Sequence, residues 1–419
     1  MTAGNVGHDV VFVGGGFRTV TFLASAPDLL AYDVVVVERG ARLGPGAFAD
    51  YATVSSSFGS RFFRTVGAEG PYGEILRAPA VARVAHAERP VDLLELGAAL
   101  GRLGRPVEEA LRPGRLLLGA DAVGVHVVTE PAPRVHVRLA DGRTVSARVG
   151  VLATGREERL APELAPFAEK VWVSSHVISA SRRPLLAAWL RRSSAGRVVI
   201  AGGSHSAFSA LGSLLEIFDE LEAADASYER PEVVVAHRSP MRLYYDSVAQ
   251  ALAEQVPERE ELLDPDRHVC PATGIVFRDS GLRHHAKDLY CAVWRGEVPN
   301  VRLERIVSLD AYAHELERTD LIVQALGYRG RAPELVVDGR RAWPDERRSP
   351  IEIDDDGRVV LDDGAADELP LYALRVEPTP RAKRDNANFG ATLYVRLAAS
   401  LVERLERARK EQRVEAAAR

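Results

Sequence analysis

Two glycine-rich turns, 188 residues apart, carry the residue types that hold the phosphates of a nucleotide. The first reads Gly14-Gly15-Gly16-Phe17-Arg18-Thr19 and follows the apolar run 10–13. A dinucleotide turn needs one glycine where the strand breaks sharply and another where the backbone approaches the pyrophosphate. Gly14 and Gly16 stand at those two positions, and Thr19 stands where a third glycine is usual.

An acidic side chain follows at the distance such a turn requires. The second apolar run, 32–37, ends at Glu38, 24 residues after Gly14, where a carboxylate can accept hydrogen bonds from both hydroxyls of an adenosine ribose. A tight turn without a ligand is the alternative. We expect an adenine dinucleotide with a free ribose to bind at Gly14, Gly15, Gly16, Phe17, Thr19, Glu38 and Arg39.

The second turn follows the run 197–201 and has small residues where the motif has its later glycines. The next apolar run, 233–236, ends in a guanidinium and a hydroxyl instead of an acid. Those groups suit the 2′-phosphate of NADPH, which a carboxylate would repel. Arg238 could also be an ordinary surface arginine. We expect NADPH at Gly202, Gly203, Ser204, His205, Ser206, Ala207, Arg238 and Ser239.

The elements around the turns form the same pattern twice, a strand, a helix and a strand. The helices are expected over 18–30 and 206–221, and alternating residues between 125 and 148 predict a small antiparallel meander. Apolar strands run into glycine turns at Ala153-Thr154-Gly155 and at Gly327-Tyr328, and we interpret both as crossings out of and back into a first domain. The expected α/β fold has two Rossmann-like domains, an FAD-binding domain of residues 1–194 and 318–419 and an NADPH-binding domain of residues 195–317 inserted into it.

Composition excludes several classes of protein. The chain has 419 residues, 46% of them hydrophobic and 27% charged, which is typical of globular domains. Its net charge of −5 gives no basic surface for nucleic acid, and no apolar stretch is long enough to span a membrane. Two cysteines and the absence of a leader pattern favour a cytoplasmic protein.

FAD at the first turn and NADPH at the second is the arrangement of flavoproteins that take a hydride and pass electrons on. The position of the two cysteines bears on which acceptor takes these electrons. Cys270 and Cys291 lie 21 residues apart, far from the first turn, so a disulfide reductase is improbable. A zinc site that includes His268, His284 and His285 is conceivable, but the spacing matches no ligand pattern. Molecular oxygen is the remaining acceptor.

A motif near residue 320 identifies a family that uses oxygen in this way. The run from Asp320 to Tyr328, followed by Pro333, resembles the signature of the siderophore-type N-hydroxylating flavin monooxygenases, with Gln324 and Leu326 departing from it. The family's second turn, in which Gln-Ser-Ala follows the glycines, is similar to His205-Ser206-Ala207. The family's tryptophan-histidine segment has no convincing equivalent.

The resemblance implies an FAD- and NADPH-dependent enzyme that hydroxylates the nitrogen of a small amine or amino acid through a flavin C4a-hydroperoxide. Siderophore or other specialised metabolism is the implied context, no metal takes part, and relatives often form homo-oligomers. It implies that a loop before the last helix contacts the flavin, at Asn386, Asn388 and Phe389. The run from Tyr244 to Ser247 could cover the adenine or only pack, and Ser280, His284 and His285 could border the substrate pocket or lie in a solvated loop. An oxidoreductase that releases hydrogen peroxide and a non-catalytic flavin-binding regulator are the alternatives.

Overall fold

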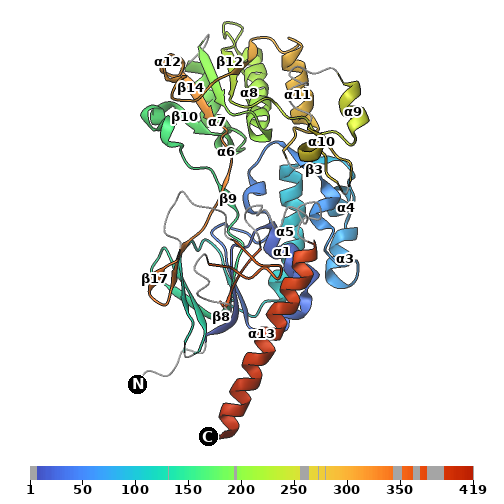
Figure 1. Cartoon of the computed structure of the whole chain (residues 1–419), viewed down its shortest axis with the longest axis vertical. Coiled ribbons are helices and arrows are strands. Elements are labelled where there is room, and N and C mark those ends of the chain that lie inside the picture. Colours follow the sequence, from blue (N-terminus) through green and yellow to red (C-terminus); the bar gives the residue numbers. More distant parts are fainter. Residues whose placement is uncertain are drawn as a thin grey trace.

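The chain forms two domains stacked along its long axis (Figure 1). The computed structural model describes residues 7–130, 132–192, 196–254, 264–271, 273–278, 280–342, 352–361, 369–374 and 391–418. Each domain is built on a sheet with a parallel centre, as the repeated strand-helix-strand pattern predicts.

The first sheet has the strand order β17-β16-β6-β7-β8-β1-β2-β5, with β18 also paired to β8. Strands β1, β2 and β8 run parallel at its centre, and β6, β7 and β8 form the predicted meander. Its strands are β1 (His8–Val13), β2 (Val34–Val37), β5 (Leu116–Leu117), β6 (Ala122–Val128), β7 (Arg134–Leu139), β8 (Thr144–Leu152), β16 (Glu334–Val337), β17 (Arg340–Arg341) and β18 (Leu371–Ala373).

Strand β8 belongs to two substructures at once. Its first half pairs antiparallel with β7, and its second half pairs parallel with β1, with Val10 opposite Val149. We expected a meander strand followed by a separate buried strand, and the structure joins them into one nine-residue strand.

Helices bury the first sheet. Helix α13, red in Figure 1, packs a leucine row at fourfold spacing into the core and then continues along the domain to the C-terminus. Each buried leucine contributes roughly 1.5–3 kcal/mol from apolar burial. The helices of this domain are α1 (Phe17–Ser25), α2 (Gly59–Phe63), α3 (Gly70–Arg77), α4 (Pro79–Ala85), α5 (Leu93–Ala110) and α13 (Ala391–Ala418), with 3-10 helices at Pro27–Ala31 and Gly46–Ala49 and a hairpin of β3 (Val54–Phe58) and β4 (Pro90–Asp92).

The second sheet has the order β10-β14-β11-β12-β13, and all its pairs are parallel. Apolar clusters cover both of its faces, as is usual for parallel sheets. Its elements are the 3-10 helix Pro162–Lys170, β10 (Val171–Val173), α6 (Ser174–Val177), α7 (Arg183–Arg192), β11 (Arg197–Ala201), α8 (His205–Ala224), β12 (Glu232–His237), α9 (Val248–Ala253), α10 (Pro265–His268), α11 (His285–Trp294), β13 (Val301–Arg305), α12 (Ala313–Glu317) and β14 (Leu321–Gln324).

Two strands of this sheet lie outside the predicted domain boundaries at 195 and 318. Strands β10 and β14, which we placed in the first domain, belong to the second sheet, where β14 pairs with both β10 and β11. The chain crosses between the domains at β9 (Arg156–Glu157) and β15 (Arg329–Gly330), which pair antiparallel with each other (Figure 1). The crossings therefore lie just after Gly155 and just after Gly327, and the second domain is the segment between them.

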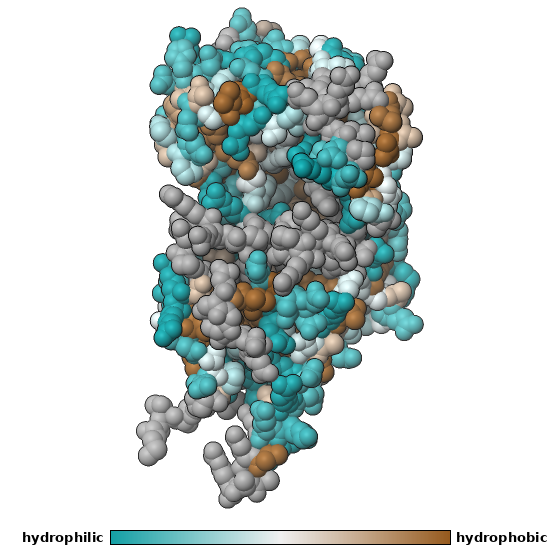
Figure 2. All heavy atoms as spheres, viewed as in Figure 1, coloured by the Kyte–Doolittle hydropathy of each residue, from teal (hydrophilic) through white to brown (hydrophobic). Residues whose placement is uncertain are grey.

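The surface is mostly hydrophilic on the face shown in Figure 2, with apolar side chains in small separate groups. Among the described residues, no helix combines the length and the apolar content needed to cross a membrane.

Candidate functional site

The first glycine turn joins β1 to α1 at the carboxyl edge of the first sheet. Gly14 has a φ of +104°, and a Cβ there would lie 2.3 Å from the carbonyl oxygen of Ala153 at the end of β8. Both the backbone conformation and the contact therefore require glycine. Gly16 precedes α1 and lies close to the backbone of Gly46, because a Cβ on Gly16 would be in van der Waals contact with the Gly46 Cα, at 3.8 Å.

Side chains around this turn fix its shape. The Thr19 hydroxyl donates to the Gly14 carbonyl at 2.6 Å, and the buried Thr19 side chain is thus tied to the turn. The carboxylate of Glu38 accepts the N–H groups of Gly15, at 2.5 Å, and Gly40, at 2.6 Å. Each carboxylate oxygen can accept a further hydrogen bond, which leaves Glu38 able to meet a ribose hydroxyl.

The second glycine turn repeats the first. Gly202 has a φ of +140°, and a Cβ there would lie 2.2 Å from the carbonyl oxygen of Ala325 at the end of β14. Gly155 follows Ala153 by two residues, and Gly327 follows Ala325 by two residues. Both glycines have positive φ, at +74° and +102°. The two domains therefore share a turn packed against the end of a neighbouring parallel strand, the place where open α/β sheets bind nucleotides.

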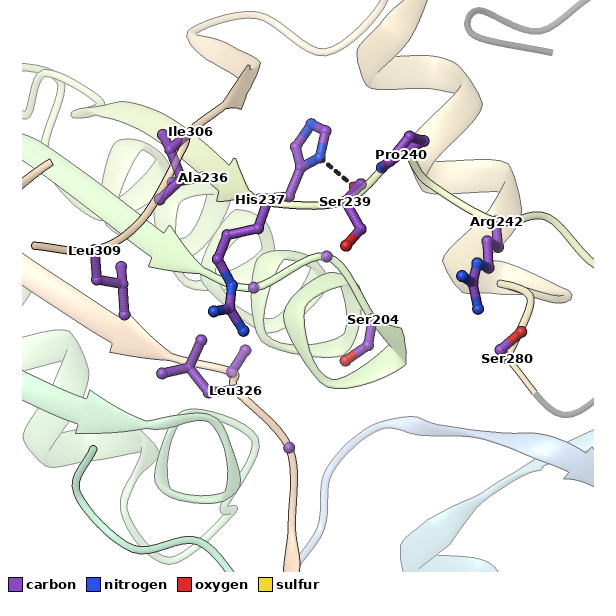
Figure 3. A pocket seen from close by; sticks show the side chains of 15 residues that line it. Ser204, Ala236, His237, Ser239, Pro240, Arg242, Ser280, Ile306, Leu309 and Leu326 are labelled. Carbon is purple, nitrogen blue, oxygen red and sulfur yellow. Dashed lines mark hydrogen bonds between the residues drawn. The ribbon is translucent and has the colours of Figure 1, made fainter. Parts of the chain in front are cut away.

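A cavity of about 410 Å³ opens at the second turn. Figure 3 shows apolar side chains, Ile306, Leu309 and Leu326, at one end and Arg242 with Ser280 at the other. The lining residues are Gly202, Gly203, Ser204, Ala236, His237, Arg238, Ser239, Pro240, Arg242, Ser280, Ile306, Leu309, Ala325, Leu326 and Gly327. The cavity thus has an apolar end that suits a purine and a cationic end that suits phosphate.

The charge of this cavity is positive. Arg238 and Arg242 are exposed, neither forms an ion pair with any residue that the structure describes, and no acid is among the lining residues. His237 donates from Nδ1 to the Ser239 carbonyl at 2.9 Å, the dashed line of Figure 3, which shapes the turn after β12. The Arg242 guanidinium lies over the Phe277 ring, 5.8 Å from its centroid. Guanidinium groups without an acidic partner can form charge-assisted bonds to a phosphate.

His205, at the start of α8, has a partner that the sequence did not indicate. Its Nε2 accepts the backbone N–H of Arg283 at 3.2 Å, and the adjacent Ser204 holds the N-cap position. Burial and the nearby Arg283 guanidinium lower the pKa of His205 to about 4, so the ring is neutral near pH 7. The sequence placed His205 in the NADPH site, and the structure shows that it also joins α8 to the segment before α11.

Other predicted residues divide between the cavity and packing. Ser280 lines the cavity, whereas His284 and His285 are not among its lining residues. Tyr244 donates to Asp246 at 3.0 Å and Ser247 caps α9, so these residues pack locally and do not cover the cavity. Ser204 and Ser206 share a hydroxyl contact of 3.0 Å, and Ala207 is fully buried in α8.

The remaining candidates lie near the domain crossings. Thr154 donates to the Arg331 carbonyl, Tyr328 hydrogen-bonds Tyr51, and Arg39 is exposed beside Glu38. Phe17 packs against Phe48 with ring centroids 5.5 Å apart. The predicted flavin loop, Asn386, Asn388 and Phe389, lies outside the described residues.

Two residues of the motif near 320 have structural roles. The Asp320 carboxylate accepts the Arg197 N–H at 2.8 Å and so ties β14 to the start of β11. Gln324, which departs from the motif, is buried and holds the segment after β9. It donates to the Arg159 carbonyl at 2.8 Å and accepts the Ala161 N–H at 2.7 Å.

The histidine, cysteine and acidic residues that the structure describes bear on metal and thiol chemistry. No group of three or more histidine, cysteine, aspartate or glutamate residues there is arranged to hold a metal ion. Neither Cys270 nor Cys291 forms a disulfide, and Cys291 is buried.

Comparisons with known proteins agree with the predicted fold. No protein-family model matches the chain, and no curated protein matches it. Solved structures do. The reduced form of ornithine hydroxylase from Pseudomonas aeruginosa is 15% identical, with a TM-score of 0.62, over 96% of this chain and 100% of that one.

Two further structures are similar over nearly the whole chain. An ornithine N-hydroxylase from Kutzneria sp. 744, with reduced FAD, NADP+ and L-ornithine, is 17% identical, with a TM-score of 0.58 over 96% of this chain and 100% of that one. The FAD-bound cadaverine monooxygenase of desferrioxamine biosynthesis from Erwinia amylovora is 13% identical, with a TM-score of 0.59 over 96% and 95%. The predicted fold, two Rossmann-like domains in one α/β chain, is confirmed.

Proposed function

We propose that this protein is an NADPH- and FAD-dependent monooxygenase that hydroxylates the nitrogen of a small amine or amino acid. The observation that carries the proposal is the pair of equivalent glycine turns, Gly14 against Ala153 and Gly202 against Ala325, with opposite charges beside them. Glu38 stands beside the first turn, and Arg238 and Arg242 line the cavity at the second. One chain thus offers sites for two different adenine cofactors.

The first turn fits FAD. The N-terminus of α1, which begins directly after Gly16, would supply N–H groups to a pyrophosphate, and the buried Glu38 would accept from the ribose. Bound FAD supplies the redox chemistry, which takes a hydride from NADPH and activates oxygen. The chain's own residues bind and orient it.

The second turn fits NADPH. The apolar end of the cavity, with Ile306 and Leu309, suits adenine, and Arg238 with Arg242 suits the 2′-phosphate. NADH lacks that phosphate and leaves both guanidinium groups in water, so the cavity favours NADPH. No general base is assigned, because the amine that attacks must already be neutral and a dry site can achieve this by disfavouring its charged form.

The substrate and setting follow from similarity of fold. The structures compared above are named for ornithine and cadaverine, which carry a primary amine at the end of a short carbon chain. A small primary amine or amino acid, together with molecular oxygen, is therefore the proposed substrate pair. Siderophore or specialised-metabolite biosynthesis in the cytoplasm is the proposed setting.

The test is a three-way balance on purified protein loaded with FAD. NADPH consumed, hydrogen peroxide formed and hydroxylamine formed are measured with ornithine, lysine and cadaverine. We expect an amine that raises hydroxylamine while peroxide falls by the same amount. Peroxide equal to NADPH with every amine would instead identify a peroxide-releasing oxidoreductase. A yellow protein that NADPH never bleaches without oxygen would identify a flavin-binding regulator.

A further inference from the structure

The two domains are joined by a short set of contacts that we call the interdomain seam, formed by residues 50–52 of the first domain with residues 178–181 and Tyr328 of the second. Its first part is a backbone pairing. Ala52 donates its N–H to the Ile178 carbonyl at 2.8 Å, and Ala180 donates to the Asp50 carbonyl at 2.7 Å. Tyr51 and Ser179 lie opposite each other in this antiparallel bridge.

The second part of the seam is the Asp50 carboxylate. It accepts the Ser181 N–H at 2.8 Å, the Ser181 hydroxyl at 2.9 Å and the Ser179 hydroxyl. Burial favours the neutral acid, but these hydrogen bonds outweigh it and hold the pKa of Asp50 below its usual value. Asp50 therefore stays charged and fully bonded near pH 7.

The third part is a pair of tyrosines. The Tyr328 hydroxyl hydrogen-bonds the hydroxyl of Tyr51 and also Ser174. Ser174 donates to Glu158 at 2.7 Å, and Ser175 donates its N–H to the same carboxylate at 2.6 Å, so Tyr328 is held from its own domain. Burial raises the pKa of both tyrosines, which keeps both hydroxyls protonated.

Each end of the seam is next to a cofactor turn. On the first domain, Gly44 donates its N–H to the Gly15 carbonyl at 2.7 Å, and a Cβ on Gly97 of α5 would meet the Phe48 carbonyl at 2.5 Å. The segment from 44 to 52 is thus held between the first turn and a helix. On the second domain, Tyr328 directly follows Gly327, which lines the cavity at the second turn.

From this arrangement we propose that Tyr51 and Tyr328 are positioning residues that set the distance between the nicotinamide and the flavin. Neither side chain lines the described cavity, so their effect is exerted through the placement of β14 against the first turn. Hydride transfer demands that the donor and acceptor atoms lie about 3–3.5 Å apart, and a 1 Å displacement can cost about a hundredfold in rate. The expected effect on the rate of hydride transfer rests on the proposed function, whereas the contacts of the interdomain seam do not depend on it.

The kinetic test measures flavin reduction by NADPH without oxygen, by stopped flow. Tyr328→Phe removes one hydroxyl and keeps the ring. We expect the rate constant at saturating NADPH to fall roughly tenfold or more, while the dissociation constant of NADPH changes less than about twofold. Tyr51→Phe should do the same, and the double variant should be no slower than either single one, because both remove one contact.

A matched control is Tyr312→Phe. The Tyr312 hydroxyl donates to Glu304 at 2.9 Å within the second domain, so this variant also deletes a tyrosine hydroxyl bonded in a protein interior, but away from the seam. Its reduction rate should equal that of the unmodified protein. A Tyr328→Phe rate equal to this control, or a loss that appears only in the NADPH dissociation constant, overturns the proposal.

A second readout needs neither cofactor. Hydrogen exchange of the Ala52 and Ala180 amides, which bond across the seam, should be faster in Tyr328→Phe than in Tyr312→Phe. If NADPH fails to reduce even the unmodified FAD-loaded protein, the proposed function is wrong. Hydrogen exchange then still tests whether Tyr328 stabilises the interdomain seam. Equal exchange in the two variants would overturn it.

Discussion

The side chain that follows the second strand differs between the two turns, and the proposed assignment of the two cofactors depends on this single difference. Glu38 is buried and accepts two backbone N–H groups, so a phosphate beside it would meet a fixed negative charge. Arg238 and Arg242 stand in the second cavity without an acidic neighbour among its lining residues. In the proposed function, this difference in charge favours a free ribose at the first turn and a ribose phosphate at the second.

Arg238→Ala tests this assignment. Because it removes a charge-assisted hydrogen bond, worth about 1.5–3 kcal/mol, we expect the KM for NADPH to rise roughly 10- to 100-fold and the KM for NADH to change little. Steady-state oxidation of each nucleotide measures this. The control is Arg143→Ala, since Arg143 is exposed and paired with Asp141 in the meander turn. Equal losses with both nucleotides would remove the 2′-phosphate from the explanation.

His205 predicts a dependence of stability on pH. Its pKa is about 4 in the folded protein against about 6.5 in an unfolded chain, so protonation favours unfolding. The stabilisation is complete above about pH 6.5 and is lost as the pH falls toward 4, by up to about 3 kcal/mol. Urea unfolding from pH 7 to pH 4 measures it.

His205→Gln is the comparison, because a glutamine carbonyl can accept the Arg283 N–H without titrating. The two proteins should be similarly stable at pH 7 and should diverge toward pH 4, with the variant more stable. Parallel curves would mean that His205 does not titrate in this range.

The spacing of residues along the sequence predicted some of the candidate site residues and missed others. Glu38 and Arg238 were found because each follows a buried strand at a fixed distance from a glycine turn. Ser280 was only one candidate among several, and Arg242, Ile306 and Leu309 were missed, although Arg242 follows Arg238 by only four residues. The bond between His205 and Arg283 spans 78 residues and leaves no local pattern.

At the scale of elements, each turn depends on the strand beside it. The Ala153 carbonyl at the end of β8 leaves no room for a side chain at Gly14. The Ala325 carbonyl at the end of β14 does the same at Gly202, so each turn packs against the end of a neighbouring strand. This explains why two similar strand ends occur in the sequence. They are equivalent parts of two domains, and the crossings follow them.

Gly14→Ala should destabilise the first domain by at least about 2 kcal/mol, from the positive φ and from the overlap with the Ala153 carbonyl. Thermal unfolding and FAD content measured from visible absorbance report it, and both should fall. Gly155→Ala is the matched control, since Gly155 also has positive φ but a Cβ there meets nothing within 4 Å. Its cost should be about 1 kcal/mol. Similar FAD loss in both variants would argue against a special role for the Gly14 contact.

The strands themselves were predictable, but their partners were not always. Buried parallel strands read as short apolar runs whichever sheet they enter, so residues 321–324 gave no sign that they pair with β11. The three-residue strand β10 was too short to stand out. For β8, the change of neighbours from β7 to β1 occurs inside one strand and has no turn residue to mark it.

At the scale of the whole molecule, the chain has separate apolar cores, one in the first domain and one on each face of the second sheet. Calorimetry should therefore resolve two unfolding transitions. NADP+ at about 100 times its dissociation constant should stabilise only one of them, by about 2.7 kcal/mol, and FAD should raise the other. Arg238→Ala should abolish most of the NADP+ shift. A single transition that both ligands raise together would show that the domains unfold as one unit.

The antiparallel pairing of β9 with β15 has a consequence for the history and engineering of this chain. Because the polypeptide leaves and returns at adjacent points, the intervening segment has entry and exit ends that lie together, as domains tolerated as insertions do. A domain attached in this way can be exchanged for a homologous one. It can also be removed and the two ends of the first domain joined by a few residues, with the strand order of each sheet unchanged.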